Sequence, residues 1–122
     1  VNFGPWDTVP KHYQTRNLYK HNPTVTLMRT TVEENEQIGR AIASKVNMSI
    51  GPCAVMLPLK GVSMIDAEGQ PFYGPEEDAA LFQVLRDEID PSKAVLIEMD
   101  AHVNDDEFAI AAAQKLIDLM NQ

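Results

Sequence analysis

Asp100 and His102 carry the side chains whose types and spacing point most directly to chemistry in this chain of 122 residues. They come directly after the apolar run 94–99, and side chains two positions apart in an extended segment point the same way. A histidine beside a carboxylate can hold a proton, move it, or bind a metal ion. Asp105 would add a third metal ligand, and Ser63 would complete a Ser-His-Asp relay, although the sequence has no G-x-S-x-G motif. We interpret Asp100 and His102 as candidate catalytic residues and assign no metal ligand.

The acidic cluster that follows has a simpler explanation. Asn104 and Glu107 have the spacing of a helix N-cap and its N3 residue. Asp105 and Asp106 would lie in the first turn, where negative charge favours the helix dipole. The acids from 105 to 107 therefore predict the start of a helix, and Asn104 stays a candidate for ligand contact as well.

The elements that must position these residues alternate between strand and helix. Apolar or β-branched runs predict strands at 24–28, 53–59 and 94–99, with the end of a strand at 1–4 and an extended segment at 17–21. A capping box of Thr31 and Glu34 begins one helix, a second covers 76–89, and a third begins near 105. This order is typical of an α/β fold with a parallel sheet and right-handed crossovers.

Helical spacing of apolar residues predicts which side of each helix is buried. The expected stripes are Ile38, Ala41, Ile42 and Val46 in the first helix, Phe82, Leu85 and Ile89 in the second, and Phe108, Ala112, Leu116 and Met120 in the third.

Polar or small residues follow every predicted strand. In an open parallel α/β sheet, ligands bind beyond the carboxyl ends of the strands. The clusters at those ends are Trp6 and Asp7; Arg29, Thr30 and Thr31; Lys60, Gly61 and Ser63; and Asp100, His102 and Asn104. We predict that they meet at one edge of the sheet and form one ligand site.

Each cluster also has a purely structural reading. Arg29 beside a helix start can bind an anion or pair with a nearby glutamate. Lys60 offers charge and Gly61 close backbone approach, but a solvated lysine on a turn would look the same. Thr31 would cap a helix whatever the function, and Trp6 can stack a planar ligand or pack under a loop.

Bulk composition excludes several classes of protein. The net charge of −8 repels phosphate backbones and anionic membranes, so we expect neither nucleic-acid nor membrane binding. The single cysteine, Cys53, lies in an apolar run and fits a buried thiol in a reducing cytoplasm. The length predicts one domain, 1–122, without an internal boundary. Since the chain opens as though inside a strand, we expect it to be part of a longer polypeptide.

Four phrases, "VNFGPWDTVP", "NLYKHNPTVTLMRTTVEEN", "GPCAVMLPLKGVSMIDAEGQPF" and "EMDAHVNDDEFA", resemble an uncharacterised protein family of bacteria, fungi and plants. It is the family related to the amino-terminal region of the tomato mosaic virus resistance protein. The resemblance implies two Rossmann-like three-layer domains, with this chain forming the carboxyl-terminal part of the second. It also implies an ATP-binding-like domain, and a plant relative that inhibits viral RNA replication by binding a viral replication protein. It carries over no catalytic residue.

Three hypotheses about function follow. The first is a nucleotide- or phospho-ligand-binding domain of a larger cytoplasmic protein, with ATP or another phosphorylated ligand as the small molecule. The second is a hydrolase or isomerase of a small organic acid, with His102 as general base and Arg29 binding the carboxylate. The third is a non-catalytic interaction or dimerisation module. The expected partners are the remainder of the same polypeptide or a second chain, in a homo-oligomer.

Overall fold

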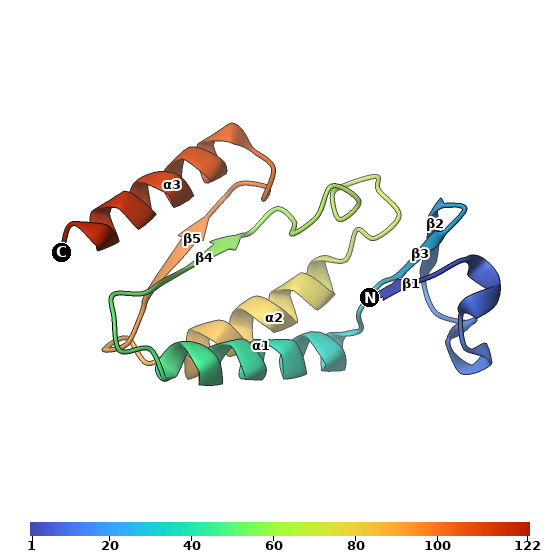
Figure 1. Ribbon diagram of the computed structural model, residues 1–122, viewed down its shortest axis with the longest axis horizontal. Helices are drawn as coiled ribbons and strands as arrows, with labels where there is room; N and C mark the ends of the chain where they lie inside the picture. Colours follow the sequence, from blue (N-terminus) through green and yellow to red (C-terminus); the bar gives the residue numbers. More distant parts are fainter. The chain divides into compact units, whose positions relative to one another are not determined.

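Residues 1–122 are described by a computed structural model, which divides into two units, Val1–Thr31 and Val32–Gln122. The first unit is a small antiparallel sheet with strand order β1-β3-β2 (Figure 1). Its elements are β1 (Asn2–Phe3), the 3-10 turns η1 (Trp6–Thr8) and η2 (Lys11–Tyr13), β2 (Leu18–Asn22) and β3 (Val25–Met28). The expected absence of a domain boundary within 1–122 stays a prediction.

Strand β3 lies at the centre of this sheet. Leu18 pairs with Met28 and Phe3 pairs with Thr26, both in antiparallel register. Thr26 and Met28 are buried, as the alternation of a strand with one covered face requires. The strand at 24–28 was predicted correctly. Its expected membership of a parallel sheet was wrong, since both of its neighbours are antiparallel. Residue types do not encode the direction of a strand's partner.

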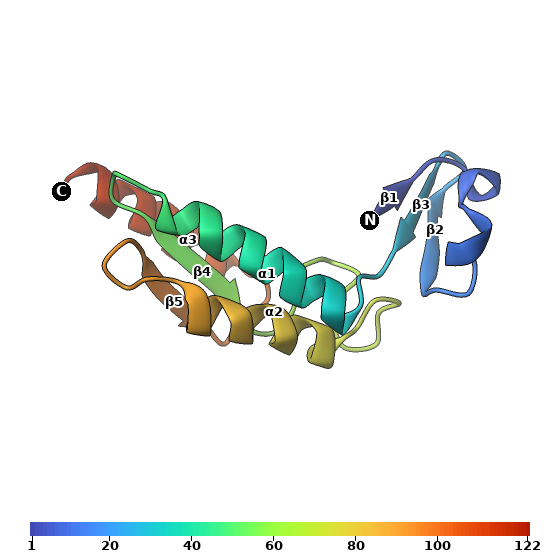
Figure 2. The ribbon, with the colours of Figure 1, turned by 90° about the horizontal axis from the view of Figure 1, so that it is seen from below.

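The second unit has three layers (Figures 1 and 2). Helices α1 (Val32–Asn47) and α2 (Pro75–Glu88) cover one face of the strands β4 (Ala54–Pro58) and β5 (Val95–Met99), and helix α3 (Asp106–Met120) covers the other. The two strands pair in parallel from Ala54 and Val95 to Pro58 and Met99. The α/β fold class is confirmed, and the arrangement is that of part of a Rossmann-like domain.

The core of this unit lies between the strands and the α1–α2 layer. The predicted stripe of α2 is confirmed, since Phe82, Leu85 and the following Ile89 are all buried. They pack with Ala43, Leu57 and Ala94.

The predicted stripe of α1 is wrong at Ile38, Ala41 and Ile42, although Val46 packs against the core. Ile38 and Ile42 are exposed, and the buried residues of the helix are Asn35, Gly39 and Ala43. A Cβ built on Gly39 would lie 3.0 Å from the Cβ of Val84, so glycine lets α1 approach α2 closely. The contact between the two helices, rather than the apolar spacing of α1 alone, decides which face is buried.

Helix α3 is buried only in part. Phe108 is buried, whereas Leu116 and Met120 of the predicted stripe are 59% and 75% exposed. None of the three helices is long and apolar enough to cross a membrane.

Candidate functional site

A hollow of about 600 Å³ opens beyond the carboxyl ends of β4 and β5. This volume suits a small organic ligand. Its lining comes from the segment after β4, the start of α2 and the turn before α3, all within the second unit: Leu59, Lys60, Ala67, Glu68, Tyr73, Pro75, Asp78, His102 and Asp105. The strand-end rule therefore located a cavity, and two of the predicted site residues, Lys60 and His102, line it.

Gly61 begins the loop that forms one wall of this hollow. Its φ is +135°, and an added Cβ would lie 1.9 Å from the Asp66 carbonyl oxygen and 2.8 Å from the His102 ring. The residue is therefore required by the backbone conformation and by a close approach of loop and histidine. Whether it also lets a ligand approach stays a prediction.

Asp66 holds the same loop from within. It is 2% exposed, and its carboxylate accepts hydrogen bonds from the main-chain N–H of Val62 at 3.0 Å and of Gly74 at 3.3 Å. Two ends of a long loop are thereby joined through one buried side chain. No sequence pattern predicts this role, because both partners are main-chain groups brought together by the fold.

The ring of His102 connects this loop to the turn after β5. The Asn104 N–H donates to Nδ1 at 3.2 Å, so the neutral ring carries its proton on Nε2. Nε2 donates in turn to the main-chain oxygens of Ser63 and Asp66, at 2.9 Å and 3.2 Å. Ser63 thus meets His102 through its carbonyl and not through its hydroxyl, which differs from a Ser-His-Asp relay.

Asp100 lies apart from the histidine ring and faces solvent. Its side chain is 85% exposed, and its carboxylate pairs with the Nζ of Lys60 at 3.6 Å. An exposed ion pair contributes about 0–1 kcal/mol, so Lys60 can exchange Asp100 for a ligand anion at small cost. In residues 1–122 no three His, Cys, Asp or Glu side chains are grouped to hold a metal ion, and the alternative of Asp100, His102 and Asp105 as metal ligands gains no support.

Both helices that start at the hollow lack a capping side chain. Helix α2 follows Gly74, which has none, and helix α3 follows Asp105, whose carboxylate makes no capping hydrogen bond. That carboxylate instead accepts the His102 N–H at 2.8 Å. The predicted N-cap at Asn104 was therefore wrong by one residue. The starts of both helices, with the positive ends of their dipoles, thus lie at the hollow without a hydrogen bond from the side chain of an N-cap residue.

The remaining predicted site residues belong to the first unit or to its end. Trp6 is 40% exposed, and the Nζ of Lys20 lies 4.4 Å from its ring centroid. Asp7 is exposed in η1. Arg29 pairs through its main chain with Asn17 and Arg16.

Thr30 and Thr31 directly precede α1, and Thr31 occupies the position that the capping box predicted. The structure describes this unit by itself, so the part that Trp6, Asp7, Arg29, Thr30 and Thr31 would take in a common ligand site stays a prediction.

Several lining residues were missed from the sequence. Glu68, Tyr73 and Asp78 come from the long segment between β4 and α2 and from the first turn of α2. The signal was the length of that segment, because long loops in compact domains are commonly functional, but length does not say which side chains turn inward.

Comparison with known proteins adds a family. A model described as the C-terminal domain of an uncharacterised protein family, UPF0261, matches residues 1–120. A UPF0261 protein of Clostridium tetani is 56% identical over 122 residues, which are 100% of this chain and 30% of the relative. A UPF0261 protein of Rhizobium meliloti is 47% identical over 122 residues, 99% of this chain and 31% of its own length.

A plant protein shows the same similarity. The ToMV resistance protein Tm-1(GCR237) of Solanum lycopersicum is 39% identical over 120 residues, which are 98% of this chain and 16% of the plant protein. The chain thus spans less than a third of the length of each of these three relatives.

Proposed function

This chain belongs to the UPF0261 C-terminal domain family, and we propose that its second unit binds a phosphorylated small molecule of nucleotide size. The observation that carries the proposal is the hollow of about 600 Å³ at which Lys60 and the uncapped starts of α2 and α3 meet. Such a ligand would be bound within a larger cytoplasmic protein.

The anionic end of the ligand would bind at Lys60. An ammonium group and helix N-termini both favour a phosphate oxygen, and charge-assisted hydrogen bonds are about twice as strong as neutral ones. The present partner of Lys60 is only the exposed carboxylate of Asp100, at 3.6 Å. A phosphate group would replace that carboxylate as the partner of the ammonium group.

The acids of the lining restrict which phosphorylated ligand fits. Glu68, Asp78 and Asp105 line the same hollow as Lys60, its one basic side chain besides the His102 ring. Carboxylates accept hydrogen bonds from sugar hydroxyls, and the half-exposed ring of Tyr73 offers a surface for stacking a base. A ligand with many negative charges would be repelled unless it brings a cation. We therefore expect a nucleoside monophosphate, or a nucleoside triphosphate with its own Mg²⁺, to bind better than free triphosphate.

The enzyme hypothesis receives less support. A general base needs an accessible lone pair, but Nδ1 of His102 accepts the Asn104 N–H and Nε2 donates to the Ser63 and Asp66 carbonyls. His102 and Asp100 therefore stay candidate catalytic residues only for a state in which the ring has left these partners.

Thermal-shift titration of the protein tests the proposal. The ligands are AMP, ATP with Mg²⁺, ATP with a chelator, ribose 5-phosphate and inorganic phosphate. We expect AMP and ATP with Mg²⁺ to raise the melting temperature more than ATP with a chelator does. The absence of a shift with every phosphorylated ligand would contradict the proposal.

A further inference from the structure

The two strands of the second unit differ in whether they carry a charged side chain. β4 is Ala-Val-Met-Leu-Pro and carries no charge, whereas β5 carries Glu98. The Nε of Arg86, on α2, donates to Glu98 at 2.9 Å. Charged side chains on an edge strand deter pairing with another strand, and uninterrupted apolar runs are typical of strands inside a covered parallel sheet. The composition of β5 therefore suits a strand at the edge of a sheet, and the composition of β4 suits a strand inside a sheet.

Backbone hydrogen bonds show which groups of β4 are left at its free edge. The Leu59 N–H donates to Met99 O at 2.9 Å, and Cys53 O accepts from the Val95 N–H at 3.0 Å. Odd-numbered residues of β4 therefore face β5, and Ala54 and Met56 face the opposite edge, where the sheet ends.

Pro58 faces that same edge and has no N–H to donate. A strand added there would pair along 54–56. By the same alternation, the outward N–H groups of β5 are those of Leu96 and Glu98.

Helix α3 supplies an independent observation. Of the two strands, it packs mainly against β4. On its side away from the buried Phe108 it carries an arc of exposed apolar residues: Ile110, Ala113, Leu116, Ile117 and Met120. Its polar residues are few, and Glu107, Gln114 and Asp118 share one side, while Asp106 lies in the first turn and Lys115 lies on the side of Phe108. α3 thus carries apolar residues on two sides, the buried side of Phe108 and this exposed arc. A surface helix with one covered face needs only one such side, so the arc suits contact with a second covering element.

We propose that the free edge of β4 and the apolar arc of α3 together receive a strand and a covering segment from polypeptide outside residues 1–122. The chain accounts for 30% of the Clostridium tetani relative and 31% of the Rhizobium meliloti relative. The remaining length of such a protein is ample for the missing strand and cover. The occupant is therefore the same polypeptide, and a second copy of the chain is the competing outcome.

Amide hydrogen exchange resolved to single residues, in the full-length polypeptide, tests the position of the added strand. We expect the N–H groups of Ala54 and Met56 to exchange at least about 100-fold more slowly than those of Leu96 and Glu98. Protection of Leu96 and Glu98 instead would place the added strand on β5 and overturn the proposal, as would rapid exchange at both edges. Protection of Ala54 and Met56 that disappears on dilution would assign the occupant to a second copy.

A pair of variants tests the arc. In the full-length polypeptide, Ile117→Lys would place a charge in a covered apolar contact and lower the melting temperature by about 5 °C or more. Gln114→Lys, on the polar side of the same helix, would leave it nearly unchanged. Equal effects of the two substitutions would show that the arc faces solvent and would contradict the proposal.

Discussion

The imidazole Nε2 of His102 donates a hydrogen bond to the main-chain oxygen of Ser63 at 2.9 Å. This bond joins the turn after β5 to the loop after β4, at the wall of the hollow. A neutral imidazole has one N–H donor and one nitrogen acceptor, so the ring binds the Ser63 carbonyl and the Asn104 N–H at once.

Removing the ring therefore loosens the loop. His102→Ala leaves main-chain groups without partners and is expected to cost about 1–3 kcal/mol of unfolding free energy. Ser63→Ala keeps the carbonyl that accepts the bond, so its effect is expected to stay within about 0.5 kcal/mol. Denaturant unfolding of both variants measures this difference. A larger cost for Ser63→Ala than for His102→Ala would show that the serine hydroxyl, and not its main chain, is the important partner.

Gly61 is the second requirement of this contact. Gly61→Ala would place a Cβ 1.9 Å from the Asp66 carbonyl oxygen at a φ of +135°, and we expect a loss of about 2–4 kcal/mol from clash and strain together. Two matched controls separate these causes by thermal or chemical unfolding. Gly69→Ala has a φ of +81° and open space, so it reports strain alone. Gly51→Ala has neither problem. Similar stabilities of all three variants would refute the close approach.

The contact of α1 with α2 predicts that a substitution in α2 will restore the stability lost by a substitution in α1. Gly39→Ala gains about 1 kcal/mol of helix propensity but pushes a Cβ to 3.0 Å from Val84, so overpacking of about 1–3 kcal/mol offsets the gain. We expect the single variant to be less stable than the parent. In the Val84→Ala background the same substitution should become neutral or stabilising. A double-mutant cycle without coupling would mean that the helices do not pack through Gly39.

Local pattern predicted much of this molecule, and its failures have physical causes. The stripe of Phe82, Leu85 and Ile89 was correct, because one side of α2 covers the core. The stripe through Ile38 was not, because the close approach at Gly39 turns another face of α1 inward. Asp66 could not be found from the sequence, since its main-chain partners converge only in the folded loop.

The edge of β5 makes a prediction about pH. The hydrogen bond from Arg86 holds the pKa of Glu98 below its ordinary value, with the attraction of the guanidinium adding to it. A lowered pKa means that the pair stabilises the fold at neutral pH, and that this contribution is lost as the pH falls through the pKa of the folded state. Arg86→Ala should raise the Glu98 pKa toward the ordinary value, as measured by NMR titration of the side-chain carboxyl. An unchanged pKa would rule out the hydrogen bond as its cause.

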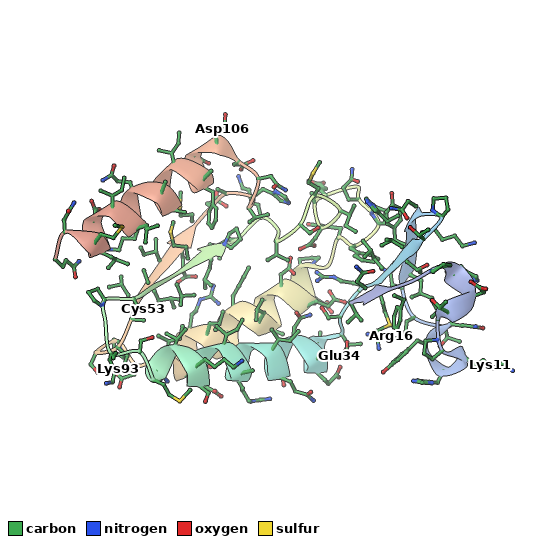
Figure 3. All side chains as sticks on the ribbon, viewed as in Figure 1. Lys11, Arg16, Glu34, Cys53, Lys93 and Asp106 are labelled. Carbon is green, nitrogen blue, oxygen red and sulfur yellow. The ribbon has the colours of Figure 1, made fainter.

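The central claim is that Lys60 binds the anionic group of a phosphorylated ligand. It is tested most directly by calorimetric titration of the best ligand into the parent, Lys60→Ala and Lys93→Ala. Lys93 is the control, because it is also an exposed lysine. It lies in the turn before β5, at the opposite end of the strands from the start of α3 at Asp106 (Figure 3).

Loss of one charge-assisted hydrogen bond predicts that Lys60→Ala weakens binding about 10–100-fold while Lys93→Ala leaves it unchanged. Equal affinities of the three proteins for that ligand would contradict the account.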